Sequence, residues 1–393
     1  MNQMNTSNRN GLIAIAFDTW ALATRFRNMG IYVYARNLLS NFREIANRHS
    51  IEFRPLVSSA VSNDANQFEA AMGFQPQQTR LLKLDRSWRF GAACLSAFIN
   101  RADLLFCPSG NTLPLNPLVP MVTTIHDVTP VVFPAYPRRL TYALRFAFGN
   151  SARFSRAIVT DSVCSKQDLI RAFGVPESKV HVVYLGYDDS IFNNSAPDHT
   201  ALARLRTTLG LKRPYVLHHG TIQPRKNLKR LIEAYRLMLS QNRNLDLDLV
   251  LVGQLGWQYE EVLAAANLSA EHGRVVLAGP QSDPNLAVLL KGASLAVIPS
   301  LYEGFCLPMV EAMACGTPTI CSNTSCLPEI SGGVLQYFDP RSVPEIAESM
   351  AQALEDGRLR QNLTQRGLER ASHFSWLRCA EETLGILKSV AAN

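Results

Sequence analysis

The stretch LAVIPSLYEGFCLPMVEAMACGTPTICS, residues 295–322, contains the pattern that decides the fold. Its apolar run at 295–300 predicts a buried strand, the segment 308–315 predicts a short helix, and the run at 318–322 predicts a second strand. Two strands joined in this way form a βαβ unit, which belongs to a parallel sheet. The stretch therefore predicts an α/β fold.

The same alternation of short apolar runs and helical segments continues in both directions. It predicts two doubly wound Rossmann-like domains, 1–190 and 201–372, with a polar linker at 188–200. We expect the remaining segment, 373–393, to contain a helix at 376–390. One alternative for this helix is to cross back and pack on the first domain. Ligands of such sheets bind beyond the carboxyl ends of the strands, so function is expected in the loops that follow them. The other predicted strands are 12–17, 51–57, 103–108, 121–127, 157–162, 180–186, 215–220, 248–253, 274–279 and 334–338.

The composition limits the classes of protein to be considered. The chain has 393 residues, 47% of them apolar and 18% charged, which is enough for two hydrophobic cores. Its eight cysteines lack the paired C-x-x-C spacing of a zinc site, so we expect reduced, mostly buried thiols. No run approaches the roughly 20 apolar residues of a spanning helix, and the polar start differs from a signal peptide. We therefore expect a cytoplasmic protein.

The net charge of +7 is unevenly distributed. Residues 1–190 contain 20 Lys and Arg against 13 Asp and Glu, whereas the other 203 residues contain 19 of each. The asymmetry favours an anionic partner for the first half, such as a membrane surface, a phosphorylated substrate or a nucleic acid. A basic surface that only aids solubility is the alternative.

Two stretches of the first half interleave cations with aromatic residues. These are RLLKLDRSWRF at 80–90 and YPRRLTYALRFAFGNSARFSR at 136–156. A basic amphipathic helix is typical of peripheral binding to anionic lipid, here the inner face of the cytoplasmic membrane. A helix that buries its aromatic side in the first domain explains half of the pattern equally well, and the charge asymmetry favours the peripheral interaction. Nucleic-acid binding would need further exposed stretches of this kind, so we expect no such partner.

The loop in the opening stretch carries an acid at each end of an apolar run. Glu303 and Gly304 follow the predicted strand, and Glu311 lies about one turn into the helix. An ionised carboxylate accepts hydrogen bonds from hydroxyl groups, each worth roughly 1.5–3 kcal/mol. Two carboxylates at different depths in the site therefore suit a sugar at one end and a ribose at the other. Free amides at the helix start suit a phosphate or a sugar hydroxyl. The amides concerned are those of Phe305, Cys306 and Leu307. Two solvated acids are the alternative.

The run E-G-F-C-L-P-M-V-E followed by A-M-A-C-G-T-P resembles the E-x7-E signature of the family 4 retaining glycosyltransferases. The fold of that family, GT-B, has two Rossmann-like domains facing each other across a cleft, and the resemblance covers nearly the whole chain. It implies that Glu303 contacts hydroxyls of the donor sugar and that Glu311 binds the ribose of the nucleotide. Cys306 departs from the family pattern, which usually has Gly there, and changes the expected shape of the pocket near the sugar.

The run HHGTIQPRKNLKRLIEAY, residues 218–235, resembles the G-x-x-x-x-R-K-N phosphate loop of the same family. A strand delivers Gly220 to a tight turn, after which Arg225 and Lys226 can reach the diphosphate. A departing diphosphate gains negative charge, so two fixed cations stabilise the transition state more than the ground state. The alternative is a solvated basic first turn of a helix, but cations there oppose the helix dipole.

The run TTIHDVTPVVFP ends a strand of the first domain with His126 and Asp127. The resemblance implies that His126 lies against the donor sugar and its leaving phosphate as a hydrogen-bond partner, while Asp127 orients the loop. A structural histidine is the alternative. Gly30 resembles the glycine-rich segment of the family in which a backbone amide approaches the β-phosphate, and a simple turn glycine is nearly as well supported.

Weaker candidates lie in the second domain. Gly253 and the loop 279–286 are similar to places where the family wraps the nucleotide base, and 323–325 resembles a segment near the diphosphate. Ordinary loop chemistry explains each as well. The D-x-D run formed by Asp246 and Asp248 precedes a predicted strand, so we interpret it as a solvated strand start and expect no metal site and no cofactor.

The resemblance implies a retaining glycosyltransferase that moves a hexose from a nucleoside diphosphate sugar to a glycan or polyprenyl-diphosphate-linked acceptor. The H-D-V-T-P and E-G-F-x-L-P runs are most similar to bacterial mannosyltransferases of surface polysaccharide and lipopolysaccharide synthesis, which favours GDP-mannose as donor. A UDP-hexose donor and a nucleotide-sugar 2-epimerase are the alternatives.

Overall fold

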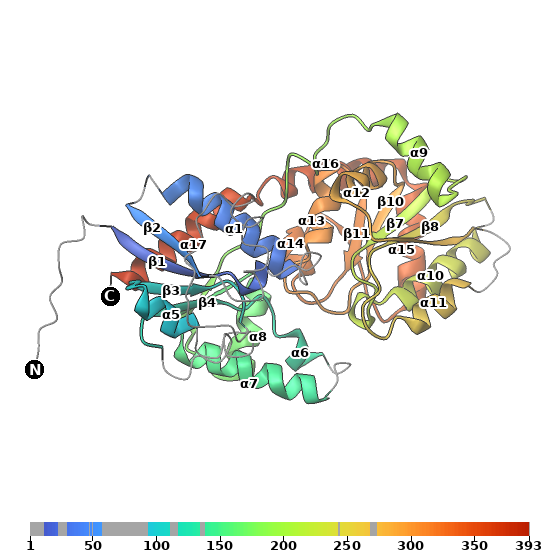
Figure 1. Cartoon of the computed structure of the whole chain (residues 1–393). Coiled ribbons are helices and arrows are strands. Elements are labelled where there is room, and N and C mark those ends of the chain that lie inside the picture. The colour runs from blue at the N-terminus through green and yellow to red at the C-terminus, as the bar shows by residue number, and fades with distance from the viewer. Residues whose placement is uncertain are drawn as a thin grey trace, which may run out of the picture. The chain divides into compact units, whose positions relative to one another are not determined.

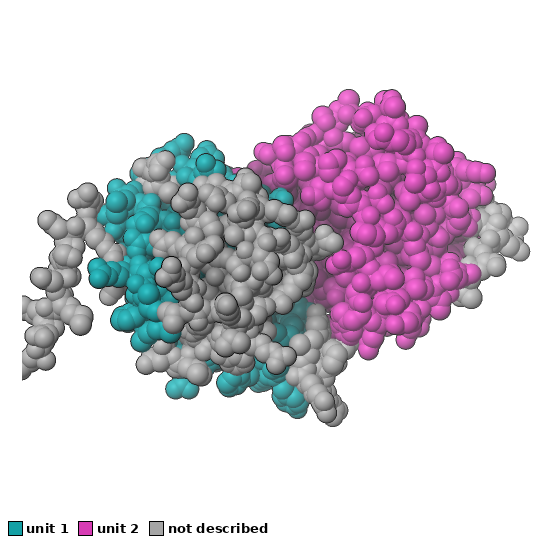
Figure 2. All heavy atoms as spheres, viewed as in Figure 1, with its two compact units in different colours: residues 1–132, 136–185, 376–393 teal, residues 133–135, 186–375 magenta. Residues whose placement is uncertain are grey.

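A computed structural model of the chain divides into two compact units, shown in teal and magenta in Figure 2. Unit 1 consists of Met1–Val132, Tyr136–Leu185 and Trp376–Asn393, and unit 2 of Phe133–Ala135 and Gly186–Ser375. The structure describes residues 12–22, 30–46, 48, 50–56, 93–110, 117–133, 138–242, 244–267 and 273–392.

The core of unit 1 is a six-stranded parallel sheet with the strand order β2-β1-β3-β4-β5-β6. The chain enters this sheet at β1, one strand in from an edge, adds β2 at that edge and then proceeds from β3 to β6 toward the other edge, which is the doubly wound topology that the sequence predicts. The inner strands are buried and largely apolar, as in β3 with the sequence LLFC, because helices cover both faces of the sheet. The strands are β1 Ile13–Asp18, β2 Ile51–Leu56, β3 Leu104–Cys107, β4 Met121–Thr124, β5 Ala157–Thr160 and β6 Val180–Val182.

The helices of unit 1 include the last helix of the chain, α17, which lies beside α1 in Figure 1. Trp376 at its start approaches Tyr34 of α1, with the ring centroids 6.3 Å apart. The end of the chain is thus part of the first unit. The α-helices described in this unit are α1 Gly30–Ala46, α5 Ala93–Ile99, α6 Thr129–Val132, α7 Arg138–Phe154, α8 Val163–Phe173 and α17 Trp376–Ala391.

The core of unit 2 is a second parallel sheet of six strands, in the order β12-β11-β10-β7-β8-β9. The strands β7, β8, β10 and β11 are buried along their whole length. Because β7 runs parallel to its neighbours β10 and β8, the loops that follow these strands meet at the same edge of the sheet. The doubly wound architecture is therefore confirmed for this unit as well. The strands are β7 Tyr215–His219, β8 Asp248–Val252, β9 Val275–Gly279, β10 Leu295–Ile298, β11 Thr319–Ser322 and β12 Gln336–Phe338.

The helices of unit 2 pack in pairs around this sheet, α10 against α15 and α13 against α16. Those described are α9 His199–Leu209, α10 Leu228–Gln241, α11 Glu260–Asn267, α12 Asp283–Lys291, α13 Leu307–Ala314, α14 Leu327–Ser331, α15 Val343–Glu355 and α16 Gly357–Ala371. Within the described ranges, none of the helices is long and apolar enough to cross a membrane.

The polar segment 188–200, expected to be a linker, packs on unit 2. Phe192 is buried, and the Lys291 ammonium of α12 donates hydrogen bonds to the Asn193 side chain at 3.2 Å and to Ser195 at 2.8 Å. The residues at the end of the segment already belong to α9. Its polar composition reflects these side-chain contacts rather than a free connection.

The D-x-D run was expected to be solvated, and this is wrong for Asp248. Its side chain is buried at the amino end of β8, and its carboxylate lies 3.5 Å from the Arg213 guanidinium and 3.9 Å from that of Arg274. The two cations compensate for the loss of water around this carboxylate. Asp246 is exposed and pairs with Arg213 at 2.5 Å. Both acids lie at the edge of the sheet opposite the carboxyl ends of the strands.

Candidate functional site

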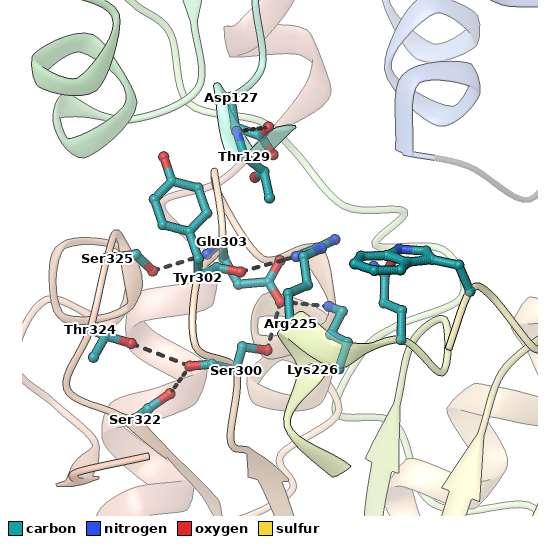
Figure 3. Close-up of polar contacts among 12 residues, drawn as sticks. Asp127, Thr129, Arg225, Lys226, Ser300, Tyr302, Glu303, Ser322, Thr324 and Ser325 are labelled. Atoms are coloured by element: carbon teal, nitrogen blue, oxygen red, sulfur yellow. Dashed lines mark hydrogen bonds and ion pairs between the residues drawn. The ribbon is translucent and has the colours of Figure 1, made fainter. Parts of the chain in front are cut away.

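The carboxyl ends of β7 and β10 bring together a buried carboxylate and two cations (Figure 3). Glu303, in the loop after β10, is 5% exposed and ion-pairs with Arg225 and Lys226, which follow β7. The Lys226 ammonium donates to Glu303 Oε1 at 2.6 Å, and the Ser300 hydroxyl donates to the same oxygen at 2.6 Å. The structure thus joins three of the residues that the sequence singled out.

The charge of Glu303 is stabilised by these neighbours. Burial alone would raise the pKa of this carboxyl group, but the attraction of Arg225 and Lys226 and the hydrogen bonds from Lys226 and Ser300 lower it to about 2. The group is therefore a carboxylate at any physiological pH and a weak base. It can hold cations or accept hydrogen bonds from hydroxyl groups, but it is poorly suited to remove a proton.

The backbone around Glu303 is braced by side chains from the segment after β11. Ser322 and Thr324 donate to the carbonyl of Ser300 at 2.6 and 3.2 Å, and the Ser325 hydroxyl accepts from the Glu303 amide at 3.0 Å (Figure 3). This is the segment that the sequence placed near a diphosphate. In the structure it fixes the position of the acidic loop.

Helix α13 begins directly after this loop. Gly304 and Phe305 are buried, and the Phe305 ring meets Phe374 edge-on at 5.3 Å. Cys306, which caps the helix before Leu307, has a left-handed backbone with φ 78° and ψ 64°. A non-glycine residue is strained there, which explains why glycine suits this position. Burial raises the pKa of the Cys306 thiol to about 12, so the group is a thiol and not a thiolate.

Glu311, on α13, is held from the end of β7. The His219 ring lies with Nε2 2.9 Å from Glu311 Oε2, across 92 residues of sequence. The histidine is 5% exposed and the carboxylate 18% exposed. The second acid of the E-x7-E run therefore lies on the same side of the sheet end as the residues that follow β7.

His218, the neighbour of His219, is fully enclosed beside Lys226. Its Nδ1 lies 2.9 Å from the carbonyl oxygen of Val297, to which it donates, and Nε2 makes no hydrogen bond within the described residues. Burial, followed by repulsion from Lys226, lowers the pKa of His218 to about 3. This ring is therefore neutral and adds no charge to the pair of cations.

Two glycines permit the close approach of the strand ends. Gly220 has φ 137°, and a Cβ there would lie 3.3 Å from Lys226 Cε and 3.8 Å from His218 Nε2. Gly253 has φ 149°, and a Cβ there would lie 2.0 Å from the carbonyl oxygen of Gly220. The structure thus supplies a packing reason for both residues that the sequence proposed as donor contacts.

In unit 1, His126 is engaged on both ring nitrogens. Nδ1 lies 2.8 Å from Asp161 Oδ2, and Nε2 lies 3.3 Å from the carbonyl oxygen of Pro108. Burial would lower the pKa of His126, but the charge and hydrogen bond of Asp161 outweigh it and raise the pKa. Two acceptors facing one ring suit an imidazolium cation. Asp127, as expected, orients the loop, because its carboxylate accepts from the Thr129 amide at 2.9 Å.

Gly30 is the first residue of α1 and is exposed. A Cβ at this position would meet no atom of the described residues within 4 Å. Neither packing nor backbone strain requires glycine here, so the proposed approach of its amide to a phosphate stays a prediction.

The aromatic residues of α7 divide between the core and the surface. Phe148 is buried, whereas Tyr142 is 71% exposed and Phe146 is 63% exposed, and Arg145 and Arg153 are exposed beside them. Burial in the first unit therefore accounts for Phe148 but leaves Tyr142 and Phe146 at the surface. The other basic stretch, 80–90, lies outside the described residues.

The sequence did not single out His219, Ser300 or Asp161 as site residues. Two consecutive histidines at the end of a predicted buried strand were a usable signal, because such a position rarely holds polar side chains without partners. Ser300 and Asp161 also follow predicted strands, but nothing in their local sequence distinguishes them from ordinary loop residues.

Models of two protein families match segments in the two halves of the chain. Residues 203–370 match the family model described as glycosyl transferases group 1, and residues 113–191 match the one described as Glycosyltransferase Family 4. The O-antigen chain mannosyltransferase B of Escherichia coli is 32% identical over 268 residues, which is 68% of this chain and 70% of that protein. An MMP alpha-(1->4)-mannosyltransferase of Mycolicibacterium hassiacum is 31% identical over 61% of this chain and 56% of its own length.

Solved structures show the same fold. Anabaena HepE in complex with UDP-glucose superposes with a TM-score of 0.71 at 18% identity, covering 96% of this chain and 100% of that one. Sucrose-phosphate synthase from Thermosynechococcus elongatus gives a TM-score of 0.70 at 18% identity, covering 97% and 99%.

The strained backbone at Cys306 predicts an unusual order of stability among small substitutions. We expect Cys306→Gly to be more stable than Cys306→Ala by about 1 kcal/mol, because only glycine relieves the left-handed strain. The measurement is chemical denaturation of both variants and the parent. If alanine were as stable as glycine, the backbone at this position would not be strained.

The low pKa of Glu303 predicts a specific dependence of stability on pH. The unfolded chain binds a proton at this group near its ordinary pKa of 4.5, whereas the folded protein does so only near 2. The contribution of Glu303 is therefore present above pH 4.5 and falls, by roughly 3 kcal/mol, as the pH drops to 2.

Denaturant unfolding measured between pH 5 and pH 2 tests this dependence. Glu303→Gln should unfold more easily at pH 5 but lose less stability on acidification than the parent. Parallel curves for the two proteins would contradict the assignment.

Proposed function

Because this chain belongs to the family 4 glycosyltransferases and has their GT-B fold, we propose that it is a retaining mannosyltransferase that uses GDP-mannose. Its product is a glycan, or a glycan linked to a polyprenyl diphosphate, in the synthesis of a bacterial surface polysaccharide. The mannosyltransferase names of the related proteins support the sugar and the pathway class.

The observation that carries this proposal is the cluster of Glu303 with Arg225 and Lys226. Its three charges sum to +1, and it lies at the carboxyl end of the unit 2 sheet, where ligands of such sheets bind. A nucleoside diphosphate sugar brings negative charge to the two cations. Glu303 then exchanges its cationic partners for hydroxyl groups of the sugar, which leaves each buried charge compensated.

The cations act most strongly on the leaving group. When the bond between the anomeric carbon and the phosphate oxygen breaks, the diphosphate gains negative charge, and fixed cations in a dry site stabilise that state more than the bound substrate. The acceptor oxygen bonds to the anomeric carbon on the face that the diphosphate leaves, and its proton passes to the departing phosphate oxygen. The anomeric configuration is retained, and no protein nucleophile is used.

In this proposal Glu303 positions the sugar. Before the donor binds, its pKa of about 2 makes it a weak base, and both of its oxygens are engaged by hydrogen-bond donors. Glu311 binds the ribose. Arg225 and Lys226 supply the charge neutralisation at the diphosphate, so the proposed reaction uses no metal.

A thermal-shift panel with GDP-mannose, UDP-glucose, UDP-N-acetylglucosamine and ADP-glucose tests the donor. We expect GDP-mannose to raise the melting temperature most, since a ligand at 100 times its Kd adds about 2.7 kcal/mol of stability. A larger shift with a UDP-sugar would replace GDP by UDP. Rapid conversion of the nucleotide sugar to an epimer without acceptor would show a 2-epimerase instead.

Arg225→Ala should remove most of the shift given by the best donor and lower turnover about 10²–10³-fold. Lys229→Ala is the matched control, since it removes a cation from the same region whose partner is the exposed Glu261. An unchanged shift in Arg225→Ala would refute the assignment of the diphosphate to this cluster.

The exposed aromatic and basic face of α7 supports a further part of the proposal, a peripheral contact with anionic membrane. The double variant Tyr142→Ser, Phe146→Ser should bind phosphatidylglycerol vesicles at least about tenfold more weakly than the parent, because it removes two side chains that would be buried in the interface.

Vesicle cosedimentation measures this binding, with phosphatidylcholine vesicles as the uncharged comparison. Leu255→Ser, which changes an exposed apolar residue of unit 2, is the control and should bind as the parent does. Equal binding by parent and double variant would remove the membrane contact from the proposal.

A further inference from the structure

The end of β7 holds a buried histidine whose polar contact reaches a different element of unit 2. β7 lies between β10 and β8 in the sheet, and His219 is its last residue. The neighbouring His218 bonds to the backbone of β10, whereas His219 bonds to a side chain of α13. Most residues of buried strands are apolar, so a polar ring in such a strand indicates a role beyond packing.

The geometry defines which ring nitrogen carries the proton. Nε2 faces the Glu311 carboxylate at 2.9 Å, and a carboxylate only accepts hydrogen bonds, so Nε2 is the donor. Nδ1 is buried and makes no hydrogen bond within the described residues. The only polar contact that the ring makes there is therefore the one to Glu311.

That contact fixes a side chain that would otherwise be mobile. Glutamate has three rotatable bonds, and among the described residues His219 provides the only hydrogen bond to the Glu311 carboxylate. The bond occupies one lone pair of Oε2 and leaves Oε1 and the rest of Oε2 available. A partly exposed carboxylate held in one orientation can accept two neighbouring hydroxyl groups without losing rotational freedom on binding.

We propose that His219 is the positioning residue of the ribose subsite, where it orients Glu311 toward the two hydroxyl groups of the nucleotide ribose. The inference rests on the proposed function, in which Glu311 binds that ribose. It assigns a role to a residue on a different strand and loop from the E-x7-E run. His219 acts through Glu311 and does not touch the sugar or the diphosphate.

The experiment compares two ligands that differ only in the ribose, GDP and 2′,3′-dideoxy-GDP, or the corresponding UDP pair if UDP gives the larger shift in the donor panel. Isothermal titration calorimetry measures both Kd values for the parent, His219→Leu, His219→Gln and Glu311→Gln. The parent should bind the dideoxy ligand about tenfold or more weakly than GDP, because it loses hydrogen bonds to a charged group.

His219→Leu should bind GDP about tenfold more weakly than the parent but bind the dideoxy ligand as the parent does. His219→Gln keeps an N–H donor near the position of Nε2, so it should recover part of the preference for ribose. The double variant His219→Leu, Glu311→Gln should lose no more affinity for GDP than Glu311→Gln alone, since the two residues act as one unit.

Several outcomes would overturn the inference. If His219→Leu kept the preference of the parent for GDP, the histidine would have no part in ribose binding. If it weakened both ligands equally, its role would be structural. A parent that binds GDP tightly but does not distinguish the two ligands would refute the ribose role of Glu311 itself, and failure of GDP and UDP to bind at all would refute the proposed function. Should His219→Leu not fold, His219→Gln and Glu311→Gln give the same comparison.

Discussion

The structure of unit 2 depends on the ion cluster around Glu303. A carboxylate that is almost fully buried would be costly without compensation, and here two cations and a serine hydroxyl compensate it. Because the cations follow β7 and the acid follows β10, the cluster ties two loops that are 77 residues apart in sequence. The loops that would bind the donor in the proposed function are therefore held in place by the charges that the donor would meet.

The parallel sheet explains why these groups can meet at all. Strands that run in the same direction release their loops at one edge, and Gly220 and Gly253 let adjacent strand ends approach more closely than any side chain would allow. The serines and threonine after β11 then hold the backbone of the acidic loop. Ion pairs and neutral hydrogen bonds thus act together to hold the loops of this site.

The sequence predicted the fold well because its strands are largely apolar runs, such as Leu295–Ile298, and helices lie in most of the connections between them. It also predicted Glu303, Arg225 and Lys226, since their motifs are local. What it missed depends on contacts between distant segments. The burial of Asp248 is compensated by Arg213 and Arg274, and the partners of His126 and Glu311 are 35 and 92 residues away. No local pattern specifies such pairs, because they are set by which strands become neighbours.

The placement of α17 in unit 1 has a consequence for the biosynthesis of the protein. Unit 2 is almost entirely one continuous segment, so it can complete its core while the ribosome is still adding residues. Unit 1 needs Trp376 and the helix that begins there, which follow unit 2 in the chain, to cover Tyr34, whose ring in turn lies 4.6 Å from that of His126. Unit 1 therefore begins before unit 2 in translation but can complete its fold only after unit 2 has been synthesised, and His126 gains its final surroundings only then.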